Sequence, residues 1–276
     1  MSEVFLQTTA GPRRVDPAAI DISIPLDFGG RQPNHFGAPP AFSEPLKADG
    51  FVGDVRAGGS CNCEVLTLTP HCNGTHTECV GHLSRERVSV SRKALSPLLL
   101  AALVSVEPVD AARSDDTADP TPLLGDRLVT AVALRKGFEH LGELPEPAPT
   151  ALVVRTLPNE AAKTAMDYTS GPVPPYFSLE AIGLMVDLGI QHLLCDLPSI
   201  DRSHDEGRLG GHRLFWGLAG DVARDAAGDR ADATVTEMIY VPDTVADGFY
   251  GLSLQLPPFM TDAAPSRPLL YALDPP

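Results

Sequence analysis

The chain has 276 residues, of which 43% are hydrophobic, enough to form one sizeable core. Its formal net charge of −15 argues against a nucleic-acid partner, because binding to phosphates requires clustered Lys and Arg. No run of about 18 apolar residues is available to span a membrane, and the first residues lack the basic and then apolar pattern of a secretory signal. We therefore expect a cytoplasmic protein that does not bind membranes.

Hydrophobic patterning in the first half of the chain predicts mainly strands. With 24 glycines and 27 prolines, the sequence favours turns and short elements over long helices. A short helix could precede the third of the predicted strands. Alternating or continuous apolar runs predict strands over residues 19–28, 63–71, 98–109, 128–134 and 150–156.

The second half of the chain predicts one clear helix followed by a strand. Ser178 is the expected N-cap, apolar residues follow it at helical spacing, and Gly189 ends the helix. Residues 190–196 then form a short apolar strand that leads into polar residues, where sites of α/β proteins often gather. Further strands are expected over residues 234–241 and 248–258.

No repeat or clear linker divides the chain. We therefore expect one domain over residues 1–276, in which residues 1–18 form a peripheral N-terminal arm. Five cysteines without a secretion signal make a disulfide framework unexpected.

Metal-capable side chains are concentrated in residues 71–82, HCNGTHTECVGH, which contain three histidines, two cysteines and one glutamate. Burying so many polar groups without partners would be unfavourable, so the cluster indicates a metal site. Imidazole, carboxylate and thiolate together suit zinc and tolerate other transition metals. An alternative is a zinc ion held by the four cysteines between Cys61 and Cys79. The spacing makes this alternative less favoured than a site of histidine and carboxylate ligands, because paired C-x2-C knuckles are missing.

Side-chain alternation within the cluster favours particular ligands. If the chain is extended here, Cys72, His76 and Glu78 face one side and His71 faces the other. Gly74 leaves room between the flanking ligands for an ion or a substrate. This parity favours Cys72 over His71 as the partner of His76, although a glycine can break the alternation.

The stretch CNGTHTECVGH resembles the motif H-x-G-T-H-x-D-x-x-x-H of the cyclase family, which includes bacterial-type kynurenine formamidases (arylformamidases) and isatin hydrolases. The Gly74-Thr75-His76 core and His82 match this motif in place. Three further stretches of the chain resemble landmarks of the family. They are IDIS near residue 20, FSLEAIGLMVDLGIQHLLCDLPSID, and DAAPSRPLLY toward the end of the chain. The likeness covers most of the chain from about residue 20 onward.

The resemblance implies a metal site with a proton-transfer group beside it. His82 would be the histidine that transfers protons during catalysis. Carried over by position, the metal ligands would be Cys72, His76, Glu78, His212 and Glu237.

One departure from the family pattern lies within the motif itself. Cys72 stands where the family has its first histidine ligand, and Glu78 stands where the family has an aspartate, so the ligand set differs in charge and reach. His71 could replace the missing histidine through a one-residue adjustment next to Gly74.

A second departure lies later in the chain. The interval from His212 to Glu237 is longer than is usual in the family, because residues 218–233 include an insertion. Glu237 is therefore the ligand assignment with the least support. Asp196 and Asp201 are interpreted as residues that cap turns or orient ligands rather than contact metal.

The resemblance also implies a fold and an activity. The fold class would be α/β, the swivelling β/β/α domain of the cyclase family, strand-rich with few helices. The protein would be a metal-dependent hydrolase of an amide, formamide, cyclic amide or lactone bond, with Zn2+ or Mn2+ to activate water. It would act on a small molecule as a homodimer or homotetramer.

Two further expectations concern the site. A non-catalytic cyclase-fold protein that binds a metal or a small ligand is the alternative, because a thiolate at Cys72 would reduce the positive charge that acidifies water. An aryl substrate would need aromatic neighbours, for which the candidates are Phe36, Tyr176, Phe177 and Trp216.

Overall fold

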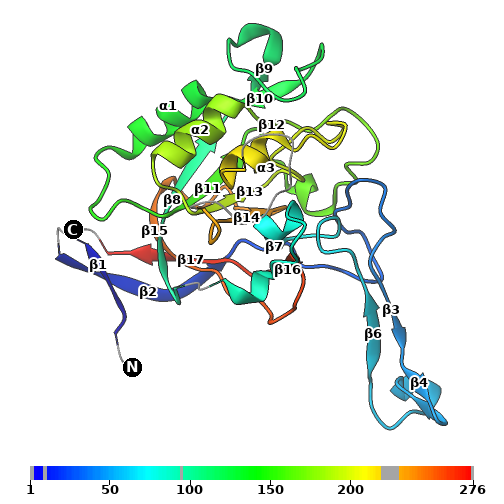
Figure 1. Ribbon diagram of the computed structural model, residues 1–276. Coiled ribbons are helices and arrows are strands. Elements are labelled where there is room, and N and C mark those ends of the chain that lie inside the picture. Colours follow the sequence, from blue (N-terminus) through cyan, green and yellow to red (C-terminus); the bar gives the residue numbers. More distant parts are fainter. Residues whose placement is uncertain (1–2, 9–10, 94–95, 219–229, 275–276) are drawn as a thin grey trace.

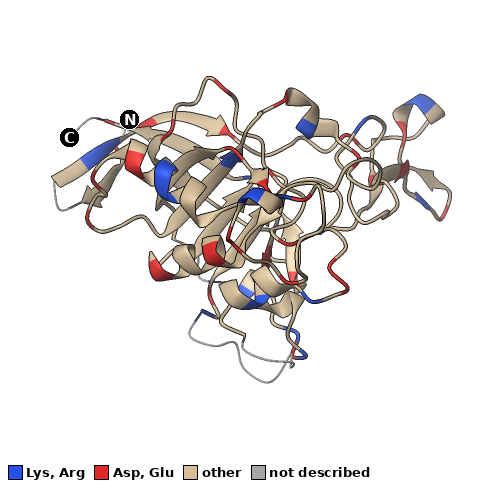
Figure 2. Ribbon diagram, turned by 90° about the horizontal axis from the view of Figure 1, so that it is seen from above, with Lys and Arg blue, Asp and Glu red and all other residues tan. Residues whose placement is uncertain are grey.

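A computed structural model describes residues 3–8, 11–93, 96–218 and 230–274 (Figure 1). Most of the segment that includes the insertion, namely residues 219–229, lies outside these ranges, as do parts of the expected N-terminal arm. None of the helices in the described ranges is both long enough and apolar enough to cross a membrane. Figure 2 shows Asp and Glu spread over strands, helices and loops alike.

A sheet of ten strands forms the centre of the molecule. Strands β8, β11, β13 and β14 are parallel to one another, and all other neighbours in this sheet are antiparallel. In spatial order the strands are β1 (Phe5–Thr8), β2 (Gly11–Asp21), β17 (Leu269–Leu273), β15 (Gly248–Ser253), β8 (Leu99–Val106), β11 (Ala151–Thr156), β13 (His192–Cys195), β14 (Thr234–Glu237), β7 (His76–Cys79) and β16 (Ala263–Pro265).

Three smaller sheets and three α-helices complete the described architecture. The first small sheet contains β12 (Tyr176–Phe177), β10 (Arg127–Val129) and β9 (Val109–Asp110). The other two pair β3 (Phe42–Pro45) with β6 (Glu64–Thr67), and β4 (Lys47–Ala48) with β5 (Phe51–Val52). The helices are α1 (Ala131–Leu141), α2 (Leu179–Asp187) and α3 (Gly210–Phe215).

Apolar side chains cover both faces of the central parallel strands. Val104 and Val154 belong to the core under the helices, whereas Leu103 and Val153 belong to the core on the opposite face. All six residues of β11 are buried, which is typical of parallel strands covered on both sides. The strand-rich α/β class with few helices is therefore confirmed.

Several predicted elements are present where the local sequence encodes them. Ser178 Oγ accepts a hydrogen bond from Ala181 N at 3.0 Å and caps α2. Gly189 follows the helix with a φ of +76°, a conformation that favours glycine. The predicted strands in residues 98–109, 150–156, 190–196, 234–241 and 248–258 correspond to β8, β11, β13, β14 and β15.

The strand predicted over residues 128–134 is wrong beyond Val129. Thr130 Oγ1 accepts a hydrogen bond from Ala133 N at 3.2 Å and caps α1. Ala, Leu, Arg and Lys follow the cap, and all four are good helix formers. The strand predicted over residues 19–28 is also displaced, because the strand in this region, β2, begins at Gly11 and ends at Asp21.

The strand predicted over residues 63–71 is shorter than expected and lies outside the main sheet. All four residues of β6 are exposed, and β6 pairs with β3 in a hairpin that projects from the body of the molecule (Figure 1). A turn separates β6 from β7, so the two do not form one continuous strand. At the other edge of the sheet β1 and β2 occupy much of residues 1–18, whose peripheral role stays a prediction, as does the single domain.

Candidate metal centre

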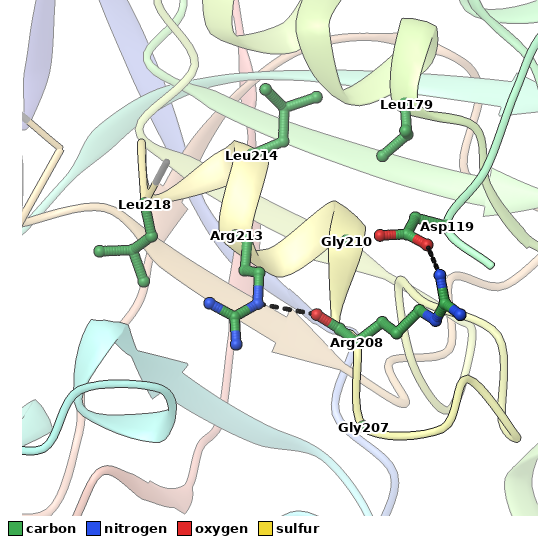
Figure 3. Close-up of a pocket in the computed structure, with 8 residues that line it drawn as sticks. All are labelled: Asp119, Leu179, Gly207, Arg208, Gly210, Arg213, Leu214 and Leu218. Atoms are coloured by element: carbon green, nitrogen blue, oxygen red, sulfur yellow. Dashed lines mark hydrogen bonds and ion pairs between the residues drawn. The ribbon is translucent and has the colours of Figure 1, made fainter. Parts of the chain in front are cut away.

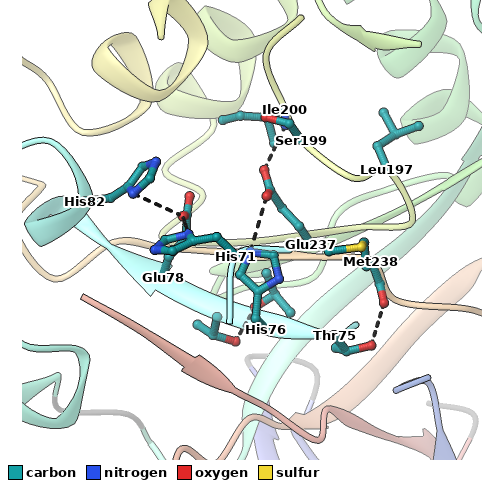
Figure 4. A network of polar contacts seen from close by, with 12 residues as sticks. His71, Thr75, His76, Glu78, His82, Leu197, Ser199, Ile200, Glu237 and Met238 are labelled. Carbon is teal, nitrogen blue, oxygen red and sulfur yellow. Dashed lines mark hydrogen bonds and ion pairs between the residues drawn. The ribbon is translucent and has the colours of Figure 1, made fainter. Parts of the chain in front are cut away.

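The pairing of β7 with β14 gathers the first candidate ligands. His76 and Glu78 are two residues apart in β7 and therefore point to the same face of the sheet. Glu237 pairs directly with His76 across the strands, so its side chain lies on that face as well. Its Oε2 is 3.4 Å from His76 Nε2, and its Oε1 accepts a hydrogen bond from Ile200 N (Figure 4).

A tight turn over residues 69–73 precedes this strand. The backbone N–H groups of Cys72 and Asn73 both donate to Thr69 O, at 2.9 and 3.0 Å. Asn73 Oδ1 accepts a further hydrogen bond from Thr69 N at 2.7 Å. Gly74 then adopts a φ of +85°, which breaks the side-chain alternation. The expectation that the chain is extended through this stretch is therefore wrong.

This turn directs the imidazole of His71 into the site. His71 Nδ1 lies 2.8 Å from Glu78 Oε2, and its Nε2 lies 2.7 Å from Asp262 Oδ2. Cys72 is buried, and that burial raises the pKa of its thiol above the ordinary value.

Helix α3 contributes a further histidine, held by a carboxylate behind it. Asp201 accepts hydrogen bonds from the backbone N–H groups of Gly211 at 2.6 Å and His212 at 3.1 Å. The same carboxylate lies 2.6 Å from His212 Nδ1. The other ring nitrogen, Nε2, faces Glu78 Oε1 at 2.7 Å and Glu237 Oε1 at 3.6 Å. A histidine whose second nitrogen is held by a carboxylate is the usual arrangement of a metal ligand.

Three overlapping groups of donor atoms result from these placements. Within each group the donor atoms lie within 4.8 Å of one another. The groups are His71, His76 and Glu78; Glu78, His212 and Glu237; and His71, His82 and Asp262. Cys72 belongs to none of the groups found among the described residues. The structure thus brings together four of the five predicted ligands, namely His76, Glu78, His212 and Glu237. The remaining member of the first two groups is His71, not the predicted Cys72.

His76 provides the test of whether a cation fits this site. Its Nδ1 lies 3.0 Å from Gly74 O, so that nitrogen carries the proton and Nε2 presents a lone pair. Nε2 is buried and has no hydrogen-bond partner among the described residues. In the neutral ring, Nε2 and the Glu237 carboxylate 3.4 Å away are both acceptors, and a cation between them makes this arrangement favourable. The donor set therefore fits a divalent metal ion.

The charges of the cluster lead to the same conclusion. Every ion-pair partner of Glu78 and Glu237 in the described part of the chain is an imidazole. Burial would raise the pKa of Glu78, but His82, His212 and His71 hold it well below its usual range. Burial would likewise lower the pKa of His71, but hydrogen bonds to Asp262 and Glu78 raise it to about 10. Protons on His71 and His212, whose pKa values the neighbouring carboxylates raise, take the place that a metal ion would occupy in balancing the carboxylates.

His82 lies at the rim of the cluster, at the end of the 3₁₀ turn Val80–His82. Its side chain is 27% exposed, and its Nδ1 lies 3.4 Å from Asp262 Oδ2 and 4.0 Å from Glu78 Oε2. Hydrogen bonds from His71 and His82 hold the pKa of Asp262 well below its ordinary value. His82 thus combines access to solvent with a carboxylate that can stabilise its protonated form.

Sequence reasoning missed Asp262. This residue immediately precedes β16, whose pairing with β7 places Ala263 opposite Glu78. No local pattern marks Asp262 as part of a site, because its contacts with His71 and His82 depend entirely on that pairing. Its position within the closing stretch DAAPSRPLLY was the only available signal.

The candidate aromatic neighbours separate into two kinds. Tyr176, Phe177 and Trp216 are buried in the core, where Tyr176 Oη donates to Asp126 and Trp216 Nε1 donates to Ala233 O. Phe36, in contrast, is 55% exposed. Of the four candidates, Phe36 is therefore the one with a ring accessible to a ligand.

A cavity of about 730 Å³ lies along the outer side of α3 but is separate from the cluster. Arg208 Nη1 at its wall forms an ion pair with Asp119 Oδ1 at 2.9 Å, and Arg213 Nε donates to Arg208 O (Figure 3). Its lining residues are Asp119, Leu179, Gly207, Arg208, Gly210, Arg213, Leu214 and Leu218. Because none of these belongs to the three donor groups, the cavity contributes no residue to the metal centre.

Comparison with known families agrees with the motif. The family model named Cyclase, with the description "Putative cyclase", matches residues 20–202, well over half of the chain. The chain therefore belongs to the cyclase family, as the motif indicated. His212 and Glu237 lie beyond the matched range. A search of curated proteins found no match.

Solved structures share the fold at low sequence identity. Isatin hydrolase A from Labrenzia aggregata, bound to benzyl benzoate, has a TM-score of 0.61 and 14% identity over 93% of this chain and 94% of that one. An isatin hydrolase bound to the product analogue thioisatinate has a TM-score of 0.62 and 13% identity, covering 93% and 92%. A predicted metal-dependent hydrolase from Bacillus stearothermophilus has a TM-score of 0.56 and 15% identity, covering 92% and 98%. These similarities confirm the cyclase-family fold class.

Proposed function

We propose that the protein is a metal-dependent hydrolase that cleaves a carbon–nitrogen bond in an amide, formamide or cyclic amide, or the ester bond of a lactone. One observation carries the proposal. Buried imidazole and carboxylate donors converge with one lone pair left unused, and the partly exposed His82 lies beside them with its own carboxylate. Relatives described as isatin hydrolases and as a metal-dependent hydrolase support this reaction class.

The proposed ligands come from both halves of the chain. Zn2+ or Mn2+ suits a set of imidazole nitrogens and carboxylate oxygens. When bound, such an ion would polarise the substrate carbonyl group and lower the pKa of the attacking water. The proposed ligands are His71, His76, Glu78, His212 and Glu237.

His82 is the proposed proton carrier. Its Nδ1 faces Asp262, so its Nε2 can accept the proton that the attacking water loses. Asp262 stabilises the resulting imidazolium through its negative charge. As the new carbon–oxygen bond forms and the carbon–nitrogen bond breaks, His82 returns the proton to the leaving nitrogen, or to the leaving oxygen of a lactone.

The non-catalytic alternative was motivated by a thiolate ligand at Cys72. Because Cys72 lies outside the donor groups found among the described residues, we keep the hydrolase as the proposal. His71 takes the place of the thiolate in the proposed ligand set, which restores a neutral imidazole at the metal.

The first test measures metal content and turnover together. Purified protein would be loaded with Zn2+ or Mn2+, its metal content measured by elemental analysis, and hydrolysis assayed with N-formylkynurenine and isatin. His82→Ala should retain the metal but lose turnover by about 10² to 10⁴-fold, the usual contribution of a general acid–base group. His71→Ala should lose the metal.

Two variants provide the controls and the contrary results. Cys72→Ala removes the neighbouring thiol and should keep both metal and activity, whereas loss of metal in this variant alone would restore Cys72 as the ligand. His140→Ala changes an exposed histidine on α1 and should alter neither measurement. Full turnover in His82→Ala would remove His82 from the mechanism, and a protein that takes up no metal would contradict the hydrolase proposal.

A further inference from the structure

The side chain of His35 is, like His76 Nε2, a buried polar group without a hydrogen-bond partner among the described residues. It is 1% exposed, yet neither Nδ1 nor Nε2 has a hydrogen-bond partner among the described residues. A buried polar group is normally hydrogen-bonded, and an unpaired one requires an explanation. His35 belongs to none of the groups of potential metal ligands found in the described ranges, so a metal ion does not supply that explanation.

The backbone around His35 is tied down on two sides. His35 N donates to Cys72 O at 3.1 Å, which joins it to the turn that leads into β7. On the other side, Asn34 N donates to Met166 O and Tyr168 N donates to Asn34 O. The position of the imidazole is therefore set by contacts with segments distant in the sequence rather than by a loose loop.

A strained turn follows His35 and presents an aromatic ring. Ala38 N donates to His35 O at 3.2 Å, and the two residues inside this turn, Phe36 and Gly37, have φ values of 54° and 65°. A left-handed φ is unfavourable for a residue as bulky as Phe, and such conformations cluster at functional sites. The Phe36 ring is 55% exposed and its centroid lies 3.8 Å from that of His35. Tyr168 also meets the imidazole edge-on, with ring centroids 6.2 Å apart.

His35 also lies within the electrostatic field of the metal centre. Burial lowers the pKa of His35 to about 4, so the ring is neutral at neutral pH, while the charge of Glu237 acts in the opposite direction and His76 in the same one. The link to the cluster is geometric, because the hydrogen bond from His35 N to Cys72 O places His35 against the turn that carries His71.

We propose that His35 is a substrate-recognition residue that hydrogen-bonds a neutral polar group of a flat aromatic substrate, whose apolar face packs against Phe36. This inference rests on the proposed function and narrows its substrate class. A neutral imidazole has one donor and one acceptor nitrogen, so it suits a carbonyl, amide or hydroxyl group. It gives no ion pair to a carboxylate substituent, which distinguishes it from an arginine or lysine at the same position.

The test compares two buried histidines that differ in their partners. His35→Phe removes both ring nitrogens, whereas His35→Gln keeps one donor and one acceptor. His192→Phe is the matched control, because His192 is also buried but its Nδ1 is hydrogen-bonded to Thr234 Oγ1 at 3.0 Å. Each zinc-loaded variant would be examined for zinc content, thermal unfolding without ligand, thioisatinate binding by calorimetry and isatin hydrolysis.

We expect His35→Phe to keep its zinc and to unfold at or above the wild-type temperature, because it loses no hydrogen bond. Its Kd for thioisatinate and its KM for isatin should rise at least tenfold, while His35→Gln should stay within about threefold of wild type. His192→Phe should unfold at a lower temperature and keep its Kd. An unfolding temperature in His35→Phe as low as in His192→Phe would make His35 a structural residue and overturn the proposal, as would an unchanged Kd.

These readouts separate the two proposals. Wild-type protein that binds thioisatinate but hydrolyses none of the tested compounds would contradict the hydrolase, while the Kd of His35→Phe would still decide the role of His35. Wild-type turnover with an unchanged KM in His35→Phe would contradict the role of His35 alone. The unfolding comparison requires no ligand, so it tests His35 whichever probe the protein binds.

Discussion

Replacing Asp201 by Asn tests whether a buried carboxylate orients a metal ligand. Asp201 is 6% exposed and accepts three hydrogen bonds, one by Oδ1 from Gly211 N and two by Oδ2 from the backbone and the ring of His212. The amide of Asn has a single acceptor oxygen, so one side of the group would meet an N–H donor with its own NH2. Loss of one charge-assisted hydrogen bond should reduce the free energy of unfolding by about 1.5–3 kcal/mol.

The effect on metal binding is the more informative part of this prediction. Without the carboxylate, the imidazole of His212 is less basic and its orientation toward Glu78 is less restricted. Removing such a supporting carboxylate typically weakens metal affinity about 10 to 100-fold, which corresponds to roughly 1.4–2.7 kcal/mol. Zinc affinity would be measured by competition with a chromophoric chelator, and stability by urea unfolding of the metal-free protein.

Asp205 provides a closely matched control in the same loop. It is 8% exposed, and its two oxygens accept hydrogen bonds from Gly207 N at 2.8 Å and Leu209 N at 2.7 Å, but in the described part of the chain it contacts no member of the cluster. Asp205→Asn should therefore cost similar stability without changing zinc affinity. If Asp201→Asn bound zinc as tightly as Asp205→Asn, the contact with His212 would have no influence on a metal ligand, and the reasoning would fail.

Three further predictions concern stability. Thr75→Val should lower the free energy of unfolding by about 2–4 kcal/mol in urea, because it leaves Ile24 N and Met238 O buried without their partner, whereas Thr75→Ser should remain near wild type. Burial lowers the pKa of His192 from 6.5 to about 4, so the unfolded state binds more protons between these pH values and stability should fall by up to about 3 kcal/mol as the pH drops through that window. His192→Gln should lose less stability than wild type over the same window, and equal losses would exclude His192 as the cause. Chelating bound zinc should lower the unfolding free energy by about 4 kcal/mol when zinc had been present at 1,000 times its Kd, and an unchanged unfolding midpoint would argue against a metal bound to the folded state.

Elements whose signals are local could be predicted from the sequence. The helix α2 follows from Ser178, the apolar spacing behind it and Gly189, because a capping hydroxyl and a left-handed glycine act within a few residues of themselves. The buried strands follow from continuous apolar runs. Where two local signals competed, at residues 128–134, the Thr130 cap prevailed over the β-branched residues, and the prediction was wrong.

The candidate site was predictable only in part, and the difference between Cys72 and His71 shows why. The sequence by itself determined that residues 71–82 carry the metal-capable side chains, and the motif singled out His76, Glu78 and His82. It could not determine that Gly74 adopts a positive φ after a turn held by Asn73, since a different backbone angle at one residue exchanges the faces of its neighbours.

Tertiary structure alone decided which distant residues complete the site. The register of β14 and β16 against β7 brings Glu237 and Asp262 to the cluster, and hydrogen bonds to Cys72 and Asn34 fix the backbone of His35. Cross-strand register is set by the packing of whole sheets, so no short stretch of sequence contains it. The metal-capable side chains can therefore be recognised within one short stretch of sequence. Which distant residues orient them, and where His35 lies relative to them, is determined by the fold.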